Sequence, residues 1–410
     1  MEPKIRLKGC CGELKTSSLS QVATMHARIG WQNLRKDEFL PKGDYYLITG
    51  TNFVDGVIDY HSCYYVSEER YNQDKNIQLK EGSILITKDG TLGKVAYVDN
   101  LEKPATLNAG VFNVVCKMDI IDSRFLYQYL KSPRLMNYVN STATGGTIKH
   151  LNQNILVSFP VRFPENEEQK FIGTYFQHLD SLIQSTAKKI ESLKQVKAAS
   201  LQSMFPQEGE TVPRVRFKGF EGEWKQIVMS DVGYMTAGGT PSTFEDSYWN
   251  GDINWLQSGA VQNNIILPSA VERKITKEGL SNSAAHLVQK DSVLIAITGA
   301  TCANIGYLTF NSTANQSVVS VEPYRGFDSK FVYQSLMINR NQILSFKGGS
   351  AQSGVTLSNL KKMSILCPDY QEQQKIGCFF FNIEEMIMQC MTRLEKLKQI
   401  KTACLDNMFV

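Results

Sequence analysis

The residues best suited to chemistry in this sequence are lysine, threonine, serine and amide side chains in short glycine-containing runs. The runs lie at residues 87–94, 144–150, 238–242, 298–301 and 347–353. Such side chains bind DNA phosphates and base edges, and glycine lets the backbone approach a phosphate. Alternatively, the glycines only form tight turns between strands. The candidate DNA-binding residues are Lys88, Thr91, Lys94, Thr147, Lys149, His150, Gly239, Thr240, Ser242, Thr298, Thr301, Lys347, Ser350 and Gln352.

Motifs typical of enzymes that act on nucleotides or peptides are missing. The sequence contains no G-x-x-x-x-G-K-[ST] phosphate loop and no glycine-rich dinucleotide or S-adenosylmethionine fingerprint. It also lacks the N-P-P-[YF] and D-P-P-[YF] tetrapeptides of amino-methyltransferases, H-E-x-x-H, G-x-S-x-G and a nuclease carboxylate cluster. We therefore expect a binding or adaptor protein with no catalytic residues and no bound cofactor or metal.

Composition sets the remaining limits. A chain of 410 residues allows two or three domains, and 42% hydrophobic residues exclude global disorder. A net charge of +4 excludes a histone-like polycation, although basic residues can still cluster locally. Apolar runs are short and no secretory signal is present, so we expect a cytoplasmic protein without membrane contact. The nine scattered cysteines predict reduced thiols rather than a zinc site.

The chain is an internal repeat. Residues 189–205 (KIESLKQVKAASLQSMF) and 393–409 (RLEKLKQIKTACLDNMF) share nine of 17 positions at an offset of 204. The starts of the halves, PKIRLKGCCGELK at 3–15 and PRVRFKGFEGEWK at 213–225, share seven of 13. The centres differ, which predicts one scaffold that carries two different recognition surfaces.

Each half is expected to contain a mixed body followed by a long helix. Helical patterns at 123–138 and 329–346 precede the long helices, which start near residues 167 and 371. The tryptophans of the bodies, Trp224, Trp249 and Trp255, favour core packing over stacking on bases. Short β-rich runs are expected at 45–49, 83–87, 94–98, 111–116, 292–298 and 316–321.

Each long helix carries one apolar seam with 3-4 spacing. A single seam cannot bury itself, so we predict that the two helices pair as an antiparallel coiled coil with pseudo-twofold symmetry. Lys197 and Lys401 interrupt the seams; each either sets the register or extends to solvent. The seam and partner-docking residues are Ile183, Ile190, Leu193 and Met204 in the first helix, and Ile387, Leu394, Leu397 and Met408 in the second.

Several segments resemble the specificity (S) subunits of type I restriction–modification systems. They are the helix endings LKQ-[VI]-K…MF, the restart PRVRFKGFEGEW, and GGTPSTFEDSYWNGDINWLQSG at 238–259. The runs LKEGSILITKDGTLGKVAYV at 79–98 and ITKEGLSNSAAHLVQKDSVLIAITGAT at 275–301 also resemble that family. The first half departs from the family because no Gly-Gly-Thr-Pro-Ser opening is present. The middle motif of the second half differs from that of the first, since Asn304 falls near the position at which Lys94 supplies a charge, so a phosphate contact of one half is expected to be missing or differently made in the other.

The resemblance implies an α+β fold with two tandem target recognition domains, each followed by one of the long helices. The boundaries that follow are target recognition domain 1 at 1–166, a central helical region at 167–205, a linker at 206–212, target recognition domain 2 at 213–370 and a C-terminal helical region at 371–410.

The resemblance also implies that each domain reads one half of a bipartite, asymmetric site in double-stranded DNA. Two DNA methyltransferase (M) subunits would dock on the helices, and motor–nuclease restriction (R) subunits would join them. The chain itself would do no chemistry, and S-adenosylmethionine, ATP and magnesium would bind the partner subunits. Two other functions are open: a self-contained restriction–methyltransferase fusion, which the missing motifs disfavour, and a coiled-coil protein adaptor without DNA readout.

Overall fold

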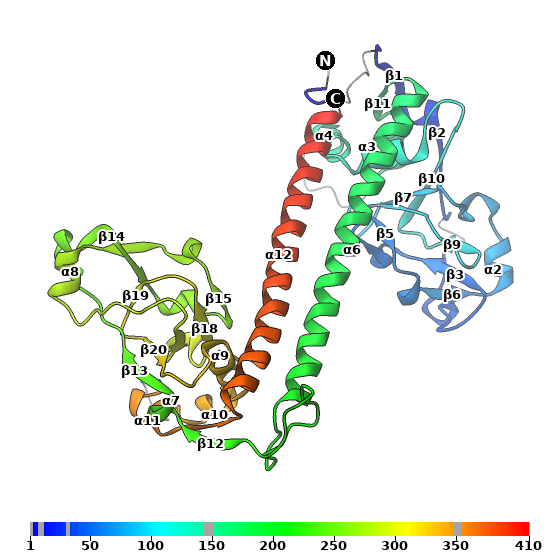
Figure 1. Ribbon diagram of the computed structural model, residues 1–410. Helices are drawn as coiled ribbons and strands as arrows, with labels where there is room; N and C mark the ends of the chain where they lie inside the picture. The colour runs from blue at the N-terminus through cyan, green and yellow to red at the C-terminus, as the bar shows by residue number, and fades with distance from the viewer. Residues whose placement is uncertain (1–2, 7–11, 30–32, 143–150, 348–353, 410) are drawn as a thin grey trace. The chain divides into compact units, whose positions relative to one another are not determined.

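The computed structural model describes residues 3–6, 12–29, 33–142, 151–347 and 354–409. The chain divides into two compact units: unit 1 comprises Met1–Ala187 and Thr392–Val410, and unit 2 comprises Lys188–Met391. Both units mix helices with β-sheets (Figure 1). Each unit therefore contains a part of both long helices, because the divisions fall within them.

Unit 1 is built around a four-stranded antiparallel sheet of order β2-β10-β7-β8, with a second sheet of order β6-β3-β9. Its strands are β1 (Lys15–Ser18), β2 (Ala23–Ala27), β3 (Tyr45–Ile48), β4 (Phe53–Val54), β5 (Val57–Ile58), β6 (Tyr64–Val66), β7 (Ile84–Thr87), β8 (Val95–Tyr97), β9 (Ala105–Leu107), β10 (Val111–Cys116) and β11 (Pro160–Phe163). Its helices are α1 (Leu19–Val22), α2 (Glu68–Asn72), α3 (Ser123–Lys131), α4 (Pro133–Thr142), α5 (Gln153–Val157) and the first part of α6 (Asn166–Met204).

Unit 2 repeats this plan, with a sheet of order β13-β20-β17-β18-β15 and a second sheet of order β16-β14-β19. Its strands are β12 (Lys225–Val228), β13 (Gly233–Ala237), β14 (Trp249–Leu256), β15 (Asn264–Ile266), β16 (Arg273–Ile275), β17 (Val293–Ala296), β18 (Ile305–Leu308), β19 (Thr313–Ala314), β20 (Val318–Pro323) and β21 (Ser364–Cys367). Its helices are α7 (Met229–Val232), α8 (Lys277–Ser281), α9 (Ser329–Ile338), α10 (Arg340–Ser345), α11 (Leu357–Lys362) and the first part of α12 (Tyr370–Met408).

The two helices expected before the long helices are each broken in two. Helix α3 ends before Ser132, whose extended backbone (φ −67°, ψ 164°) is the conformation that the following Pro133 favours. Helix α9 ends at Ile338, and Asn339 (φ −82°, ψ 14°) separates it from α10. The helical patterns predicted at 123–138 and 329–346 are therefore confirmed, although each forms two helices, and the predicted strands lie within one or two residues of the observed ones.

Helices α6 and α12 pack antiparallel within each unit. In unit 1, Asp180 of α6 pairs with Lys401 of α12, and Tyr175 lies 3.6 Å from the Cys404 thiol. Both helices are uninterrupted over 39 residues (Figure 1). No helix in the described ranges is long and apolar enough to cross a membrane.

The predicted apolar seam is the buried side of these helices. Positions between the seam residues are mostly exposed, as expected for a stripe with 3-4 spacing. Among the seam residues, Ile190, Met204 and Met408 are buried, and Ile183, Leu193, Ile387, Leu394 and Leu397 are half-buried.

The Met-Phe ending of each repeat anchors a helix end in a core. The Phe409 ring packs against Phe176, with ring centroids 5.7 Å apart, and against Phe125 and Tyr129 of α3. In unit 2, Phe205 occupies the same position, and its partners are Trp224, Phe331 and Phe380. These contacts between buried aromatic rings explain why the Met-Phe endings recur in both halves.

The repeated start of each half is held by a bidentate ion pair. Arg6 donates through Nε and Nη2 to both carboxylate oxygens of Glu168, each at 2.7 Å. Arg216 makes the same pair with Glu372 at 2.6 and 2.7 Å. Both carboxylates are buried near the start of a long helix, so the two-point geometry fixes the chain start against it.

Candidate functional site

The strand directions of unit 1 bring several loops to one end of its main sheet. Strands β2 and β7 end there, and β8 and β10 begin there. Lys88, the first residue after β7, donates its N–H to Gly110 O (2.9 Å) and accepts a hydrogen bond from Leu151 N (2.9 Å). The hairpin loop at 88–94, the loop at 108–110 and the segment that follows residue 150 therefore meet at this end, which we call the sheet end.

The hairpin loop between β7 and β8 is held by hydrogen bonds of the Thr87 side chain. The Thr87 hydroxyl donates to Thr91 O, and it accepts a hydrogen bond from Lys94 N (2.9 Å). Gly90 and Gly93 have φ values of 71° and 70°, which favour glycine. Thr87 is buried and supports the loop from its inner side, whereas the side chains of Thr91 and Lys94 are exposed.

A hollow of about 540 Å³ opens beside this loop. Lys88 lies in its wall with Nζ 5.5 Å from the Phe112 ring centroid, an arrangement that keeps the cation over an aromatic face. The lining includes charged, amide and apolar side chains: Ala27, Arg28, Ile29, Lys88, Asp89, Phe112, Leu151, Asn152 and Gln153.

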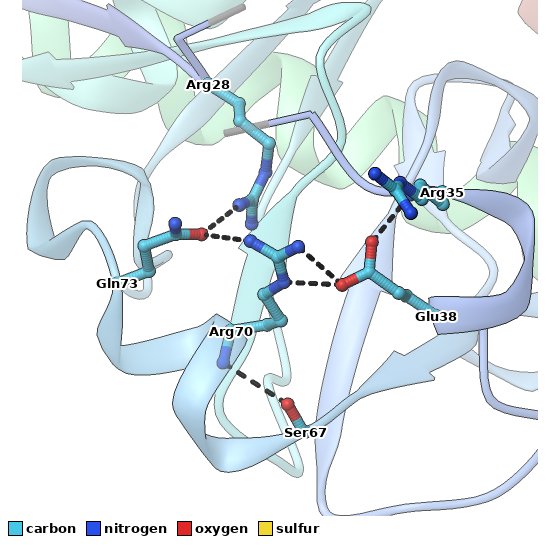
Figure 2. A network of polar contacts seen from close by, with 6 residues as sticks. All are labelled: Arg28, Arg35, Glu38, Ser67, Arg70 and Gln73. Carbon is cyan, nitrogen blue, oxygen red and sulfur yellow. Dashed lines mark hydrogen bonds and ion pairs between the residues drawn. The ribbon is translucent and has the colours of Figure 1, made fainter. Parts of the chain in front are cut away.

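Arg28 belongs to a network of polar contacts with Gln73, Arg70 and Glu38 (Figure 2). It is 2% exposed, and its Nε donates to Leu107 O at 2.8 Å. Its Nη1 and the Nη1 of Arg70 donate to the same Gln73 oxygen, at 3.4 and 3.0 Å, and Arg70 pairs with Glu38 at 2.6 Å. Burial lowers the pKa of Arg28. This network positions the walls of the hollow rather than offering a free cation.

Unit 2 forms the same sheet end with different side chains. Ile297 takes the place of Lys88: its N–H donates to Ser317 O (2.9 Å), and its carbonyl accepts from Val355 N (2.8 Å). Ala303 adopts a φ of 64° at the position of Gly93. The backbone frame of the hairpin loop is thus shared, while the residues that it presents are not.

The Gly-Gly-Thr-Pro-Ser segment enters the sheet end of unit 2 after β13. Gly239 N donates to Ala314 O at 2.9 Å, and a Cβ on Gly239 would lie 2.2 Å from the backbone of Ala284. In unit 1 the equivalent carbonyl, Leu107 O, accepts from the Arg28 guanidinium instead. The equivalent carbonyl therefore accepts from a buried arginine side chain in unit 1 and from a glycine N–H in unit 2.

Asn304 is engaged inside unit 2. Its Oδ1 accepts hydrogen bonds from Arg340 Nη2 (3.1 Å) and Asn263 Nδ2 (3.2 Å), and its Nδ2 donates to Val261 O (3.2 Å). Lys94 of unit 1 is exposed at the equivalent position. The difference expected from the sequence is therefore present: this position of the loop offers a cation in unit 1 and a structural amide in unit 2.

Two segments, residues 12–195 and 221–401, match a family model described as "Type I restriction modification DNA specificity domain". The chain belongs to this family. Each specificity domain contains one sheet end, formed by the loops 88–94 and 297–304 respectively.

Curated relatives agree with this assignment. The chain is 21% identical over 361 residues to the putative type I restriction enzyme MjaX specificity subunit of Methanocaldococcus jannaschii, a match covering 85% of this chain and 82% of that protein. It is 22% identical to the EcoBI specificity subunit of Escherichia coli, covering 77% and 71%. The 27% identity to the MjaIX specificity subunit of M. jannaschii covers 46% of this chain and only 44% of that relative.

The chain also shares its fold with a protein of known structure. The crystal structure of a type I restriction–modification system S subunit from M. genitalium aligns with a TM-score of 0.71 and 16% identity, covering 100% of this chain and 99% of that one. The predicted α+β architecture with two tandem domains is therefore confirmed.

The candidate residues of the specificity domains divide by accessibility. Gly239 is buried, so its place in the structure is explained by packing and gives no support to a DNA contact. Lys88, Thr240 and Thr301 are half-buried, and Thr91, Lys94, Ser242, Thr298 and Lys347 are exposed. The remaining candidates, Thr147, Lys149, His150, Ser350 and Gln352, lie outside the described residues.

Sequence reasoning missed several accessible residues at or beside these loops. Gln316, in the loop between β19 and β20, accepts a hydrogen bond from the Thr240 hydroxyl. Gln257, directly after β14, is exposed, and Phe244 is 99% exposed on the segment that follows Ser242. For Gln257 and Phe244 the only sequence signal is an amide or aromatic residue in a polar segment, whereas Gln316 was expected at the start of a strand. The tryptophans, by contrast, are buried as predicted.

The titratable side chains offer little to a metal. Within the ranges that the structure describes, no group of three or more His, Cys, Asp or Glu side chains is placed to hold a metal ion. The chemistry that the sheet ends can supply is hydrogen bonding, cationic contact and shape.

Proposed function

We propose that this chain is the sequence-specific DNA-recognition subunit of a type I restriction–modification complex, and that each unit reads one half of a bipartite, asymmetric site in double-stranded DNA. One observation carries the proposal. The two units hold their sheet-end loops with the same backbone hydrogen bonds but present different side chains, such as Lys88 and Lys94 against Ile297 and Asn304. A common frame with different side chains is what reading two different half-sites requires.

The residues at the sheet ends have the chemistry for this task. Lysines bind phosphates, whereas amides and hydroxyls read base edges in the major groove. In unit 1 the exposed Lys94 is suited to a phosphate, and the hollow beside Lys88 is lined by the amides of Asn152 and Gln153. Unit 2 offers the amides Gln257 and Gln316 and the hydroxyl of Thr298.

We further propose that the long helices dock two DNA methyltransferase subunits, which motor–nuclease subunits then join. Large apolar side chains on the outside of the helices support a protein contact there. They are Leu182 and Val196 in α6, and Met386, Met391 and Ile400 in α12, all at least 40% exposed. Adenine methylation and ATP-driven cleavage belong to the partners, which carry S-adenosylmethionine, ATP and magnesium; the complex acts on DNA in the cytoplasm.

Salt-dependent DNA binding by the assembled complex tests the proposal. The chain purified with its cognate methyltransferase subunits should bind a duplex containing its site far more tightly than a scrambled duplex. The logarithm of the affinity should fall linearly with the logarithm of salt concentration, because phosphate contacts release counterions. The chain alone should transfer no methyl group. Sequence-independent binding by the active complex would contradict the proposal.

The alternative is a protein adaptor that uses only its helices. The exposed apolar residues of α6 and α12 fit this function as well. The adaptor predicts that sheet-end substitutions leave DNA binding by the complex unchanged, whereas the recognition subunit predicts that they alter it.

A further inference from the structure

We infer that Gln316 reads an adenine in the half-site of unit 2 and that Thr240 positions its amide for this contact. The inference rests on the proposed function, since it names one base-reading residue of the recognition surface. It starts from a hydrogen bond between two loops that are far apart in the sequence: the Thr240 hydroxyl donates to Gln316 Oε1 across 76 residues.

The backbone on both sides of this hydrogen bond is fixed. Gly239 N donates to Ala314 O (2.9 Å), which ties the segment carrying Thr240 to the strand before Gln316. Asn315 N donates to Leu256 O at 2.9 Å, and the Asn315 side chain accepts from Ser317 N at 3.2 Å. Gln316 therefore stands on a braced loop, although its own side chain is exposed.

The hydrogen bond leaves the amide of Gln316 with the groups that adenine recognition needs. The carbonyl oxygen has two lone pairs, and Thr240 uses one of them. The second lone pair can accept from adenine N6, and the amide NH₂ can donate to adenine N7, which together form the two-point contact of glutamine with adenine in the major groove. Because the Thr240 hydrogen bond restricts the rotamers of a flexible side chain before DNA arrives, less conformational entropy is lost on binding.

Unit 1 has no glutamine at the position that corresponds to Gln316. Asn108 N donates to Ile48 O at 2.9 Å, as Asn315 N donates to Leu256 O, so the two loops correspond. The residue after Asn108 is Ala109, where unit 2 has Gln316. The contact inferred for Gln316 therefore has no counterpart at Ala109 of unit 1, and it contributes to the asymmetry of the whole site.

The inference is tested in the complex with the partner methyltransferase subunits, using Gln316→Ala, Thr240→Val, Thr240→Ser and the wild type. Adenine methylation mapped genome-wide gives the recognised motif, and titration with duplexes carrying each base at one position gives affinities. We expect Gln316→Ala to lose roughly tenfold to a hundredfold in affinity for the wild-type site and to accept other bases at one adenine of the unit 2 half-site. Thr240→Val should relax the same position less, and Thr240→Ser should restore it because the hydroxyl returns.

Gln226→Ala is the matched control. Gln226 is an exposed glutamine of unit 2 in β12, which leads through α7 into the opposite end of β13, so its removal should change neither motif nor affinity. An unchanged motif and affinity in Gln316→Ala would overturn the inference, as would an equal loss on every sequence or relaxation at a base other than adenine. If the wild-type complex itself recognised no bipartite motif, the proposed function would fail instead.

Discussion

Lys401 of α12 forms an ion pair with Asp180 of α6, at the position where a lysine interrupts the apolar seam. Gln128 of α3 donates to the other carboxylate oxygen of Asp180 at 3.1 Å. The lysine side chain is only 12% exposed, so its ammonium group does not extend to solvent. The carboxylate thus links both long helices of unit 1 to the helix α3 that supports the sheet.

Unit 2 repeats the arrangement with Lys197, Glu384 and Gln334. The glutamine donates to the glutamate at 2.9 Å, and the lysine side chain is 17% exposed. A lysine in an apolar seam is stable only in the helix register that places a carboxylate opposite it. Of the two roles open for the interrupting lysines, register selection therefore fits the contacts, and solvent extension does not.

Removing one partner of the pair should destabilise the protein. In Lys401→Ala the partly buried carboxylate of Asp180 loses its ion-pair partner, which costs about 2 kcal/mol, less than for a fully buried pair because the Asp180 side chain is 23% exposed. Urea denaturation should show this loss, whereas Lys398→Ala, an exposed lysine of the same helix, should change the unfolding free energy little. The double variant Lys401→Met/Asp180→Leu should recover most of the loss. Equal stability of Lys401→Ala and Lys398→Ala would contradict a structural role of the pair.

Alkaline pH should stabilise unit 1 through Lys131. Burial, and then the nearby Lys401, lowers the pKa of Lys131 to about 8 from an ordinary value of 10.5. Between these values the unfolded chain holds a proton that the folded chain lacks, so stability rises with pH across this window and levels off below about pH 8. Lys131→Met, the residue found at the equivalent position 337 of unit 2, should abolish this rise. Parallel stability curves of wild type and variant between pH 7 and 10.5 would refute the assignment.

Exposed Lys94 should contact phosphate rather than a base. Lys94→Ala should weaken DNA binding by the complex about equally on all sequences and reduce the slope of log affinity against log salt by about 0.9. Lys80→Ala is the control, because Lys80 is exposed before the other end of β7. A change of the recognised motif in Lys94→Ala would identify a base contact instead.

Periodic features of the molecule were predictable from sequence because they repeat locally. The 3-4 spacing of residues such as Ile190 and Met204 defined the buried side of α6, and short β-rich runs between turn signals located β7 and β10. The pairing of Lys401 with Asp180 was not predictable, since it depends on the register between two helices and joins residues 221 positions apart in sequence.

The sheet-end residues show why a candidate site is harder to predict than a fold. A glycine in the sequence indicates that another group lies close to its backbone, but it does not identify that group. At Gly239 the close group is the protein's own backbone at Ala284. Gln316 lay at the start of an expected strand, and only its contact with Thr240 distinguishes it from other polar turn residues. Arg28, similarly, carries no sequence signal that separates a buried brace from a DNA-binding arginine.

The long helices should set the spacing between the half-sites. One heptad inserted after Ile190 and one after Leu394 keeps the seam in phase and leaves the ion pairs of Lys197 and Lys401 intact. Seven residues add about 10 Å along a helix, which is roughly three base pairs of DNA. The methylated motif should keep both half-sites and gain this many unread bases. Three-residue inserts should abolish activity, and an unchanged gap with full activity would show that the docked subunits fix the spacing.

The methylated motif of a chimaera tests most directly whether each unit reads its own half-site. Residues 16–150 would be replaced by the same segment of a related specificity subunit with a different site, and adenine methylation would be mapped genome-wide in cells carrying the methyltransferase subunits. We predict that one half of the motif changes to that of the donor while the other half, read by unit 2, stays the same. A change in both halves, or in neither, would contradict the partition of recognition between the two units.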